Sequence, residues 1–281
     1  MSAADDLDAG CRRVETPCGE GTVAWRVWGT GPALLLGHGA QGAWSHWVRN
    51  IPVLARSRTV IAVDLPGQGD SAEPPERTHR AIADVLAAGL RAIVGAEPVD
   101  IAAFSMSGTL LAWMAVHHPA LVRRIVLIGC GGLDTPHGHI DVASVRGLAG
   151  EAREARLRAN LLGLMLHDAA AVDGLALELL VANARKARWV DPAMVVPDRL
   201  KRALPHIACP VDAIWGEHDR PHPDPQAQAA VIRAVQPDCD FRVIAGAGHW
   251  VMYERPDAFD AALRDLLATP LRAVREPESL P

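Results

Sequence analysis

Short apolar runs alternate along the chain with longer stretches in which apolar positions recur every three or four residues. Runs of this length indicate buried strands, and the longer periodic stretches indicate helices. The helical stretches of the first half lie at 44–54, 81–94 and 108–117. The apolar runs around them lie at 22–28, 33–36, 59–63, 99–104 and 125–128. This alternation predicts βαβ units and a parallel sheet.

The same rhythm returns near the C-terminal end, in the apolar runs 211–215 and 241–244 and the helical patterns 227–235 and 256–267. Between the two blocks, apolar runs of strand length disappear. Helical patterns rich in Ala, Leu, Arg and Glu replace them, at 151–166 and 175–188. We therefore predict a core made of residues 1–133 and 206–281, with a helical cap at 134–205 inserted into it. The polar or proline-containing ends, up to about Gly10 and from about Thr269, are predicted to be poorly ordered.

Composition narrows the classes of protein that fit this pattern. A chain of 281 residues with 49% hydrophobic and 22% charged residues can bury a large core, and its net charge of −5 predicts no nucleic-acid partner. No apolar run approaches the length of a membrane span, and the acidic start lacks the features of a signal peptide. The five scattered cysteines indicate reduced thiols. We expect a cytoplasmic protein without a membrane partner. The sequence is compatible with a homo-oligomer.

Three polar residues follow predicted strands in settings that suggest nucleophilic catalysis. Ser105 lies in Ala-Phe-Ser-Met-Ser-Gly, Asp219 in Gly-Glu-His-Asp-Arg, and His249 in Gly-Ala-Gly-His-Trp. Because parallel strands end at one edge of a sheet, the three side chains are expected to meet there. A serine becomes a strong nucleophile when an imidazole takes its proton and a carboxylate orients that imidazole. The sequence therefore predicts acyl-type hydrolysis of a small molecule.

Alternatives exist for two of these roles. Ser105 could simply cap the following helix, and Ser107 is a second candidate nucleophile. Glu217 and Asp134 compete with Asp219 as the acid. We favour Asp219 because it follows the strand next to the one that delivers His249.

Hydrolysis of this kind also needs two N–H groups that stabilise the oxyanion. We expect one from Met106, directly after the nucleophile, and one from Ala40 in the glycine-containing loop at 38–41. The turn from Asp64 to Ser71 is interpreted as structural. His137 and His139 are interpreted as part of a cap hinge, because no further ligands complete a metal site. No metal or cofactor is expected.

These motifs resemble those of the α/β-hydrolase superfamily over residues 23–267. The resemblance rests on His38-Gly39, Asp64-Leu65-Pro66-Gly67, the Ser105 turn, Trp215-Gly216-Glu217-His218-Asp219 and Gly248-His249-Trp250. It implies an α/β fold with a mostly parallel eight-stranded sheet, flanking helices and an inserted helical cap. It also implies a cofactor-free serine hydrolase.

Within the superfamily the chain looks most like the meta-cleavage product hydrolases, which cut a C–C bond in dienoates. Trp44-Ser45, Arg49-Asn50-Ile51 and Gly131-Gly132-Leu133 carry this likeness, with His249-Trp250. By it, Asn50, Trp250 and a cap arginine, Arg185 or Arg188, would hold the carboxylate and keto groups of the substrate. Gly39 and Phe104 complete the predicted substrate contacts.

Two features depart from that subfamily. The loop at His38 lacks a Gly-Pro-Gly run, and Phe104 stands where a polar residue often precedes the nucleophile. Both predict a more apolar pocket, in which a small ester, thioester or lactone fits as well as a dienoate. Two other functions stay open: a cofactor-free perhydrolase or acyltransferase with the same three residues, and a ligand-binding accessory protein without turnover.

Overall fold

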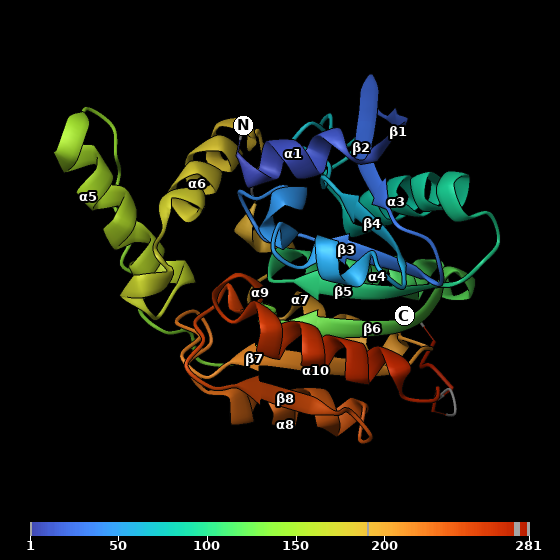
Figure 1. Ribbon diagram of the computed structural model, residues 1–281. Helices are drawn as coiled ribbons and strands as arrows, with labels where there is room; N and C mark the ends of the chain where they lie inside the picture. Colours follow the sequence, from blue (N-terminus) through green and yellow to red (C-terminus); the bar gives the residue numbers. More distant parts are fainter. Residues whose placement is uncertain (1, 190, 273–275, 280–281) are drawn as a thin grey trace.

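A single twisted sheet runs through the middle of the protein (Figure 1). The computed structural model describes residues 2–189, 191–272 and 276–279, and within them eight strands join in the order β1-β2-β4-β3-β5-β6-β7-β8. The β1–β2 and β2–β4 pairs are antiparallel, and every other pair is parallel. The strands are β1 (Arg12–Cys18), β2 (Gly21–Trp28), β3 (Ala33–Gly37), β4 (Thr59–Val63), β5 (Val99–Phe104), β6 (Val122–Ile128), β7 (Val211–Gly216) and β8 (Phe241–Ile244).

Helices cover both faces of the sheet, which is why the central strands read as continuous apolar runs. Every residue of β5 is buried. One face packs against α3 (His79–Val94), α4 (Met106–His117), α7 (Arg199–Ala203) and α8 (Pro225–Val235). The other face packs against α1 (Ala3–Ala9), α2 (Ile51–Leu54), α9 (Val251–Glu254) and α10 (Pro256–Ala268).

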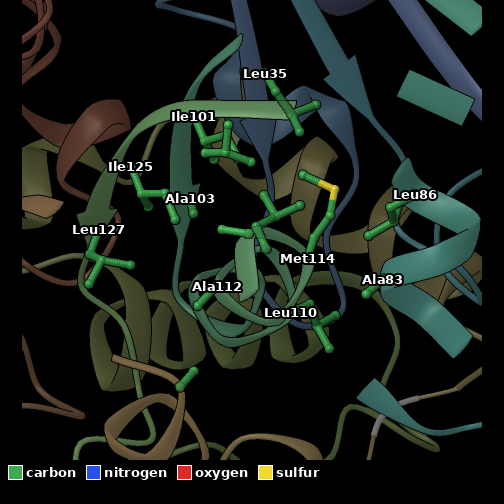
Figure 2. Packing of buried hydrophobic residues seen from close by; sticks show 14 of the residues in the cluster. Leu35, Ala83, Leu86, Ile101, Ala103, Leu110, Ala112, Met114, Ile125 and Leu127 are labelled. Carbon is green, nitrogen blue, oxygen red and sulfur yellow. The ribbon is translucent and has the colours of Figure 1, made fainter. Parts of the chain in front are cut away.

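Helix α4 lies at the centre of the first of these layers. Figure 2 shows its side chains Leu110 and Met114 among Leu35 of β3, Ile101 of β5 and Leu86 of α3. This packing fixes the start of α4 against the end of β5. The turn between them is therefore held by the core.

The segment between β6 and β7 leaves the sheet and returns to it. Its helix α5 (Gly150–Asn160) projects away from the body of the molecule (Figure 1), whereas α6 (Gly174–Lys186) buries Ala176 and Leu179 in the apolar cluster that also contains Trp44. Helix α7, in contrast, packs beneath the sheet, where Leu200 and Ala203 join the core cluster. The division at residues 134 and 205 stays a prediction.

The N-terminal residues contradict one expectation. Residues up to about Gly10 were predicted to be poorly ordered, yet Ala3–Ala9 form a helix capped by Ser2. This helix is tied to β2, because Asp8 pairs with Arg26 at 2.6 Å and Trp28 Nε1 donates to the Leu7 carbonyl at 2.9 Å. Its partners are distant in sequence, so local composition did not predict it. At the other end, residues 273–275 and 280–281 of the predicted poorly ordered tail lie outside the described residues.

No helix in the described part of the chain combines the length and apolar character needed to cross a membrane.

Candidate active site

Ser105 occupies a sharp turn between the end of β5 and the start of α4. Its φ of 53° and ψ of −117° lie in a region that side-chain-bearing residues rarely adopt. The turn is tight because small residues surround it: a Cβ on Gly37 would lie 2.7 Å from Ser107, and one on Gly108 would lie 2.8 Å from the Cβ of Cys130. The strained backbone lifts the Ser105 hydroxyl away from the helix and toward the cavity above it.

The structure places the imidazole of His249 between Ser105 and Asp219. His249 Nε2 lies 3.1 Å from Ser105 Oγ, and His249 Nδ1 lies 2.8 Å from Asp219 Oδ2. Because an ionised carboxylate can only accept, Nδ1 carries the hydrogen and Nε2 is free to take the serine proton. These are the contacts that a nucleophile, its base and an orienting acid require.

The ionisation of Asp219 suits the orienting role. The carboxylate is 1% exposed. Burial by itself would favour the neutral acid, but the attraction of His249 and hydrogen bonds from His222 and His249 outweigh it and lower the pKa of Asp219 to about 2. The side chain is therefore charged at neutral pH and holds His249 in one tautomer.

His222 is a contact of Asp219 that the sequence analysis missed. Its backbone N–H donates to Asp219 Oδ1 at 2.9 Å, and its Nδ1 lies 3.2 Å from the same oxygen. The available signal was the spacing of Asp219 and His222, which lie three positions apart in Asp219-Arg220-Pro221-His222. Asp219, His222 and His249 are also the described residues whose ligand atoms could hold a metal ion. Both carboxylate oxygens already accept hydrogen bonds from the imidazoles, so the arrangement fits acid–base chemistry.

A cavity of about 250 Å³ opens above Ser105 and is lined mostly by apolar side chains. The floor comes from the sheet edge, and the walls come from the segment between β6 and β7. The apolar lining consists of Phe104, Met106, Ile140, Leu164, Met165, Pro192, Val195, Val196 and Pro221.

Within the part of the chain that the structure describes, the polar side chains lining this cavity are Ser105, four imidazoles and the carboxylate of Asp191. Among the described residues, no lysine or arginine lines it. Burial lowers the pKa of His46, with help from His38 and His249, and burial also lowers the pKa of His222 despite the neighbouring Asp219. These two imidazoles are therefore neutral, and neither brings a positive charge to the cavity.

The two predicted oxyanion donors border the same space. Ala40 and Met106 both line the cavity, together with Gly39. Met106 is the first residue of α4, so its N–H has no carbonyl partner within the helix. Their role in the reaction stays a prediction.

The predicted substrate contacts Asn50 and Trp250 lie outside the cavity lining. Asn50 is buried and donates to the Met252 carbonyl at 3.0 Å and to Asp260 at 2.9 Å. The indole of Trp250 is also buried and donates to the His46 carbonyl at 2.9 Å. These side chains hold α9 and α10 in place, which corrects the roles that the resemblance suggested.

The cap arginines are a second correction. Arg185 borders a separate groove between α5 and α6. Arg188 donates to the carbonyls of Gly69 and Ser71. Helical position alone did not reveal these partners. Of the predicted substrate contacts, Gly39 and Phe104 line the cavity, and so does His137, which had been interpreted as part of a hinge.

The loop after β4 braces this edge of the sheet. Asp64 accepts hydrogen bonds from the Trp44 N–H at 2.7 Å and the Asp70 N–H at 2.9 Å, and it pairs with Arg26. The contacts of Asp64 are those expected of a structural turn.

Comparisons with known proteins agree with this architecture. A family model described as "Alpha/beta hydrolase family" matches residues 34–262. The 2-hydroxymuconate semialdehyde hydrolase of Pseudomonas sp. (strain CF600) is 28% identical over 280 residues, which cover 93% of this chain and 92% of the relative. The 2-hydroxy-6-oxo-6-phenylhexa-2,4-dienoate hydrolase of Burkholderia cepacia is 26% identical, over 85% of this chain and 89% of its own.

Solved structures show the same likeness. Naproxen esterase (carboxylesterase NP) from Bacillus subtilis superposes with a TM-score of 0.75 at 21% identity, covering 94% of this chain and 95% of its own. At that identity the likeness concerns the fold alone. With the family match, it confirms the fold and the family resemblance predicted from the sequence.

Proposed function

This chain belongs to the alpha/beta hydrolase family, and from that premise we propose that it is a serine hydrolase acting on small, uncharged carboxylic esters or lactones. The observation that carries the proposal is the hydrogen-bonded chain from Ser105 through His249 to Asp219 at the floor of an apolar cavity. The family supports the hydrolase class, and the cavity supports the choice of substrate.

The reaction follows from the positions of these atoms. His249 Nε2 takes the Ser105 hydroxyl proton as Oγ attacks the carbonyl carbon of the ester. The negative charge on the carbonyl oxygen is stabilised by the N–H groups of Ala40 and Met106. The ester C–O bond then breaks, and the alcohol leaves with the proton held by His249. Water attacks the acyl-enzyme with His249 as base again, which releases the acid and restores Ser105.

The charge of the cavity favours an ester over a dienoate. The two curated relatives named above are hydrolases of dienoate-type compounds, and a dienoate carries a carboxylate. Burying a carboxylate without a cation is costly. In the described lining, His46 and His222 are neutral, and Asp191 adds a further negative charge. An uncharged acyl group meets no such penalty.

A matched pair of substrates tests this choice. p-Nitrophenyl butyrate and p-nitrophenyl hemisuccinate present acyl chains of similar size, but only the hemisuccinate bears a charge. We expect kcat/KM to favour the butyrate by about 100-fold, which corresponds to roughly 3 kcal/mol of unpaired-charge penalty. Equal rates, or faster cleavage of a 2-hydroxy-6-oxo-dienoate, would contradict the substrate class.

The serine assignment has its own test. A fluorophosphonate probe is expected to label the wild-type protein at Ser105, while the S105A variant should neither label nor turn over above a small residual rate. A protein that binds ligands without turnover would fail to label. Hydrolysis by S105A near the wild-type rate would refute the role of Ser105.

A further inference from the structure

Two histidines share the carboxylate of Asp219. Oδ2 faces His249 Nδ1 at 2.8 Å, while Oδ1 accepts the backbone N–H of His222 at 2.9 Å and lies 3.2 Å from its Nδ1. One imidazole is enough to complete the mechanism described above. The second one, buried at 4% exposure, therefore needs a separate explanation.

The tautomer of His222 follows from its partner. A carboxylate offers no proton, so the hydrogen between the two groups must lie on His222 Nδ1. This leaves Nε2 of His222, a residue that lines the cavity, without a hydrogen. His222 is thus a neutral side chain that donates toward the acid.

We propose that His222 is a positioning residue for the reaction: it holds Asp219 in line with His249 and takes up part of the carboxylate charge, so that His249 becomes an active base at lower pH. This inference rests on the proposed function. The physical reason is that each hydrogen bond accepted by a carboxylate reduces its attraction for another proton donor. A less attractive Asp219 stabilises the protonated form of His249 less, so that form loses its proton sooner as pH rises.

The other groups around His222 and His249 do not supply the hydrogen bond that His222 gives to Asp219. From the segment after β6, His137 faces His222 with ring centres 5.8 Å apart. Trp215 of β7 lies edge-on to His222 at 6.2 Å and carries no charge. His46, in the segment between β3 and α2, is neutral because burial lowers its pKa. Asp219 is the ionised group in contact with both imidazoles.

Two substitutions separate the hydrogen bond from simple packing. In H222N the amide nitrogen can take the place of Nδ1 and keep a donor toward Asp219, whereas H222L fills the space without a donor. We expect H222L to raise the pH of half-maximal kcat/KM for p-nitrophenyl butyrate on the acid limb by about half to one unit. Activity below that limb should then fall about three- to tenfold, while H222N stays near the wild-type profile.

A second measurement does not depend on turnover. In the S105A background, NMR titration of the His249 ring should show the same upward displacement in H222L and little in H222N. In the wild-type protein, the ¹⁵N shifts of His222 should show hydrogen on Nδ1. A displacement in the NMR titration without any ester hydrolysis would mean that the proposed function is wrong and the charge sharing is right.

The inference itself fails under three results. Equal pH displacements in H222N and H222L would assign the effect to packing. An unchanged His249 titration in H222L would show that no charge is shared. Hydrogen on Nε2 of His222 in the wild-type protein would overturn the hydrogen bond directly, even if H222L did not fold.

Discussion

Glu254 of α9 accepts a hydrogen bond from the backbone N–H of His167 at 2.9 Å. The same buried carboxylate accepts the N–H of Asp168 at 2.6 Å and the N–H of Gly248 at 2.6 Å. Gly248 immediately precedes His249, and residues 167 and 168 closely follow Leu164 and Met165, which line the cavity. One side chain thus links the loop that carries His249 to the segment between β6 and β7.

Removing this link should affect both stability and turnover. E254A leaves three N–H groups without their charged acceptor, so we expect the free energy of unfolding to fall by about 3 kcal/mol. We also expect kcat/KM to fall at least about tenfold, because His249 is held less firmly. Urea denaturation and steady-state kinetics would measure these effects.

The control for E254A is E154Q, which removes an exposed ion pair with Arg158. Its stability should change by less than about 1 kcal/mol. If E254A behaved like E154Q, the link described above would have no energetic weight.

The positive φ of Ser105 predicts that glycine is more stable than alanine at this position. S105G and S105A should both be inactive, since each lacks the hydroxyl. Glycine adopts positive φ without a Cβ penalty, so S105G should be more stable than S105A by about 1 kcal/mol after its larger unfolded-state entropy is counted. Thermal and urea unfolding of the two inactive variants compare them directly, and equal stabilities would show that the turn stores no strain.

The buried carboxyl of Asp260 makes the stability of the folded protein depend on pH. Burial raises its pKa to about 6, although the hydrogen bond from Asn50 partly opposes this and nearby Asp257 adds to it. The unfolded carboxyl has a pKa of about 3.9. The folded state therefore holds the proton more tightly, and the wild-type protein loses stability as pH rises from about 4 to about 6.

The D260N variant carries no such charge. Its advantage over wild type should be about 1 kcal/mol larger at pH 8 than at pH 5, after allowance for solvent screening. Urea unfolding at the two pH values measures this difference. D265N, on the exposed face of the same helix, serves as the control. An advantage of D260N that did not grow with pH would mean that Asp260 ionises normally in the folded state.

The close approach of Gly108 in α4 to Cys130, two residues beyond the end of β6, predicts that substitutions at these two positions are coupled. A Cβ at Gly108 would lie 2.8 Å from the Cβ of Cys130 and would overlap its sulfur. G108A should therefore cost about 2 kcal/mol. Removing the sulfur with C130A should recover about 1 kcal/mol of that loss in the double variant, beyond the sum of the single effects. Additive losses in a double-mutant cycle would show that the side chains at positions 108 and 130 are not in steric contact.

The local sequence determined the positions of most strands and the identity of the three candidate catalytic residues that follow them. Apolar runs buried on both faces of a parallel sheet need no distant information to be recognised, so the runs at 59–63, 99–104 and 241–244 coincide with β4, β5 and β8. The same register predicted that Ser105, Asp219 and His249 would meet. The structure brings them to within hydrogen-bond distance. Their catalytic roles await the experiments above.

Other features depended on contacts between residues far apart in the chain. The stretch 44–54 was predicted as one helix, but the structure has a short helical turn at Trp44–Trp47 and α2 at Ile51–Leu54. The edge strand β1 alternates exposed and buried residues, and α1 is tied to β2 by Asp8 and Trp28. Neither element carries a strong apolar run.

The tertiary structure alone decided what each polar side chain contacts. Asn50 binds α9 and α10, Arg188 binds the loop at Gly69, and neither reaches the cavity. Glu254 acquires its position through the backbone N–H groups of His167 and Asp168, more than eighty residues away. Periodicity along a chain reports burial because burial repeats with the backbone. Hydrogen-bond partners are set by packing in three dimensions, which no local pattern encodes.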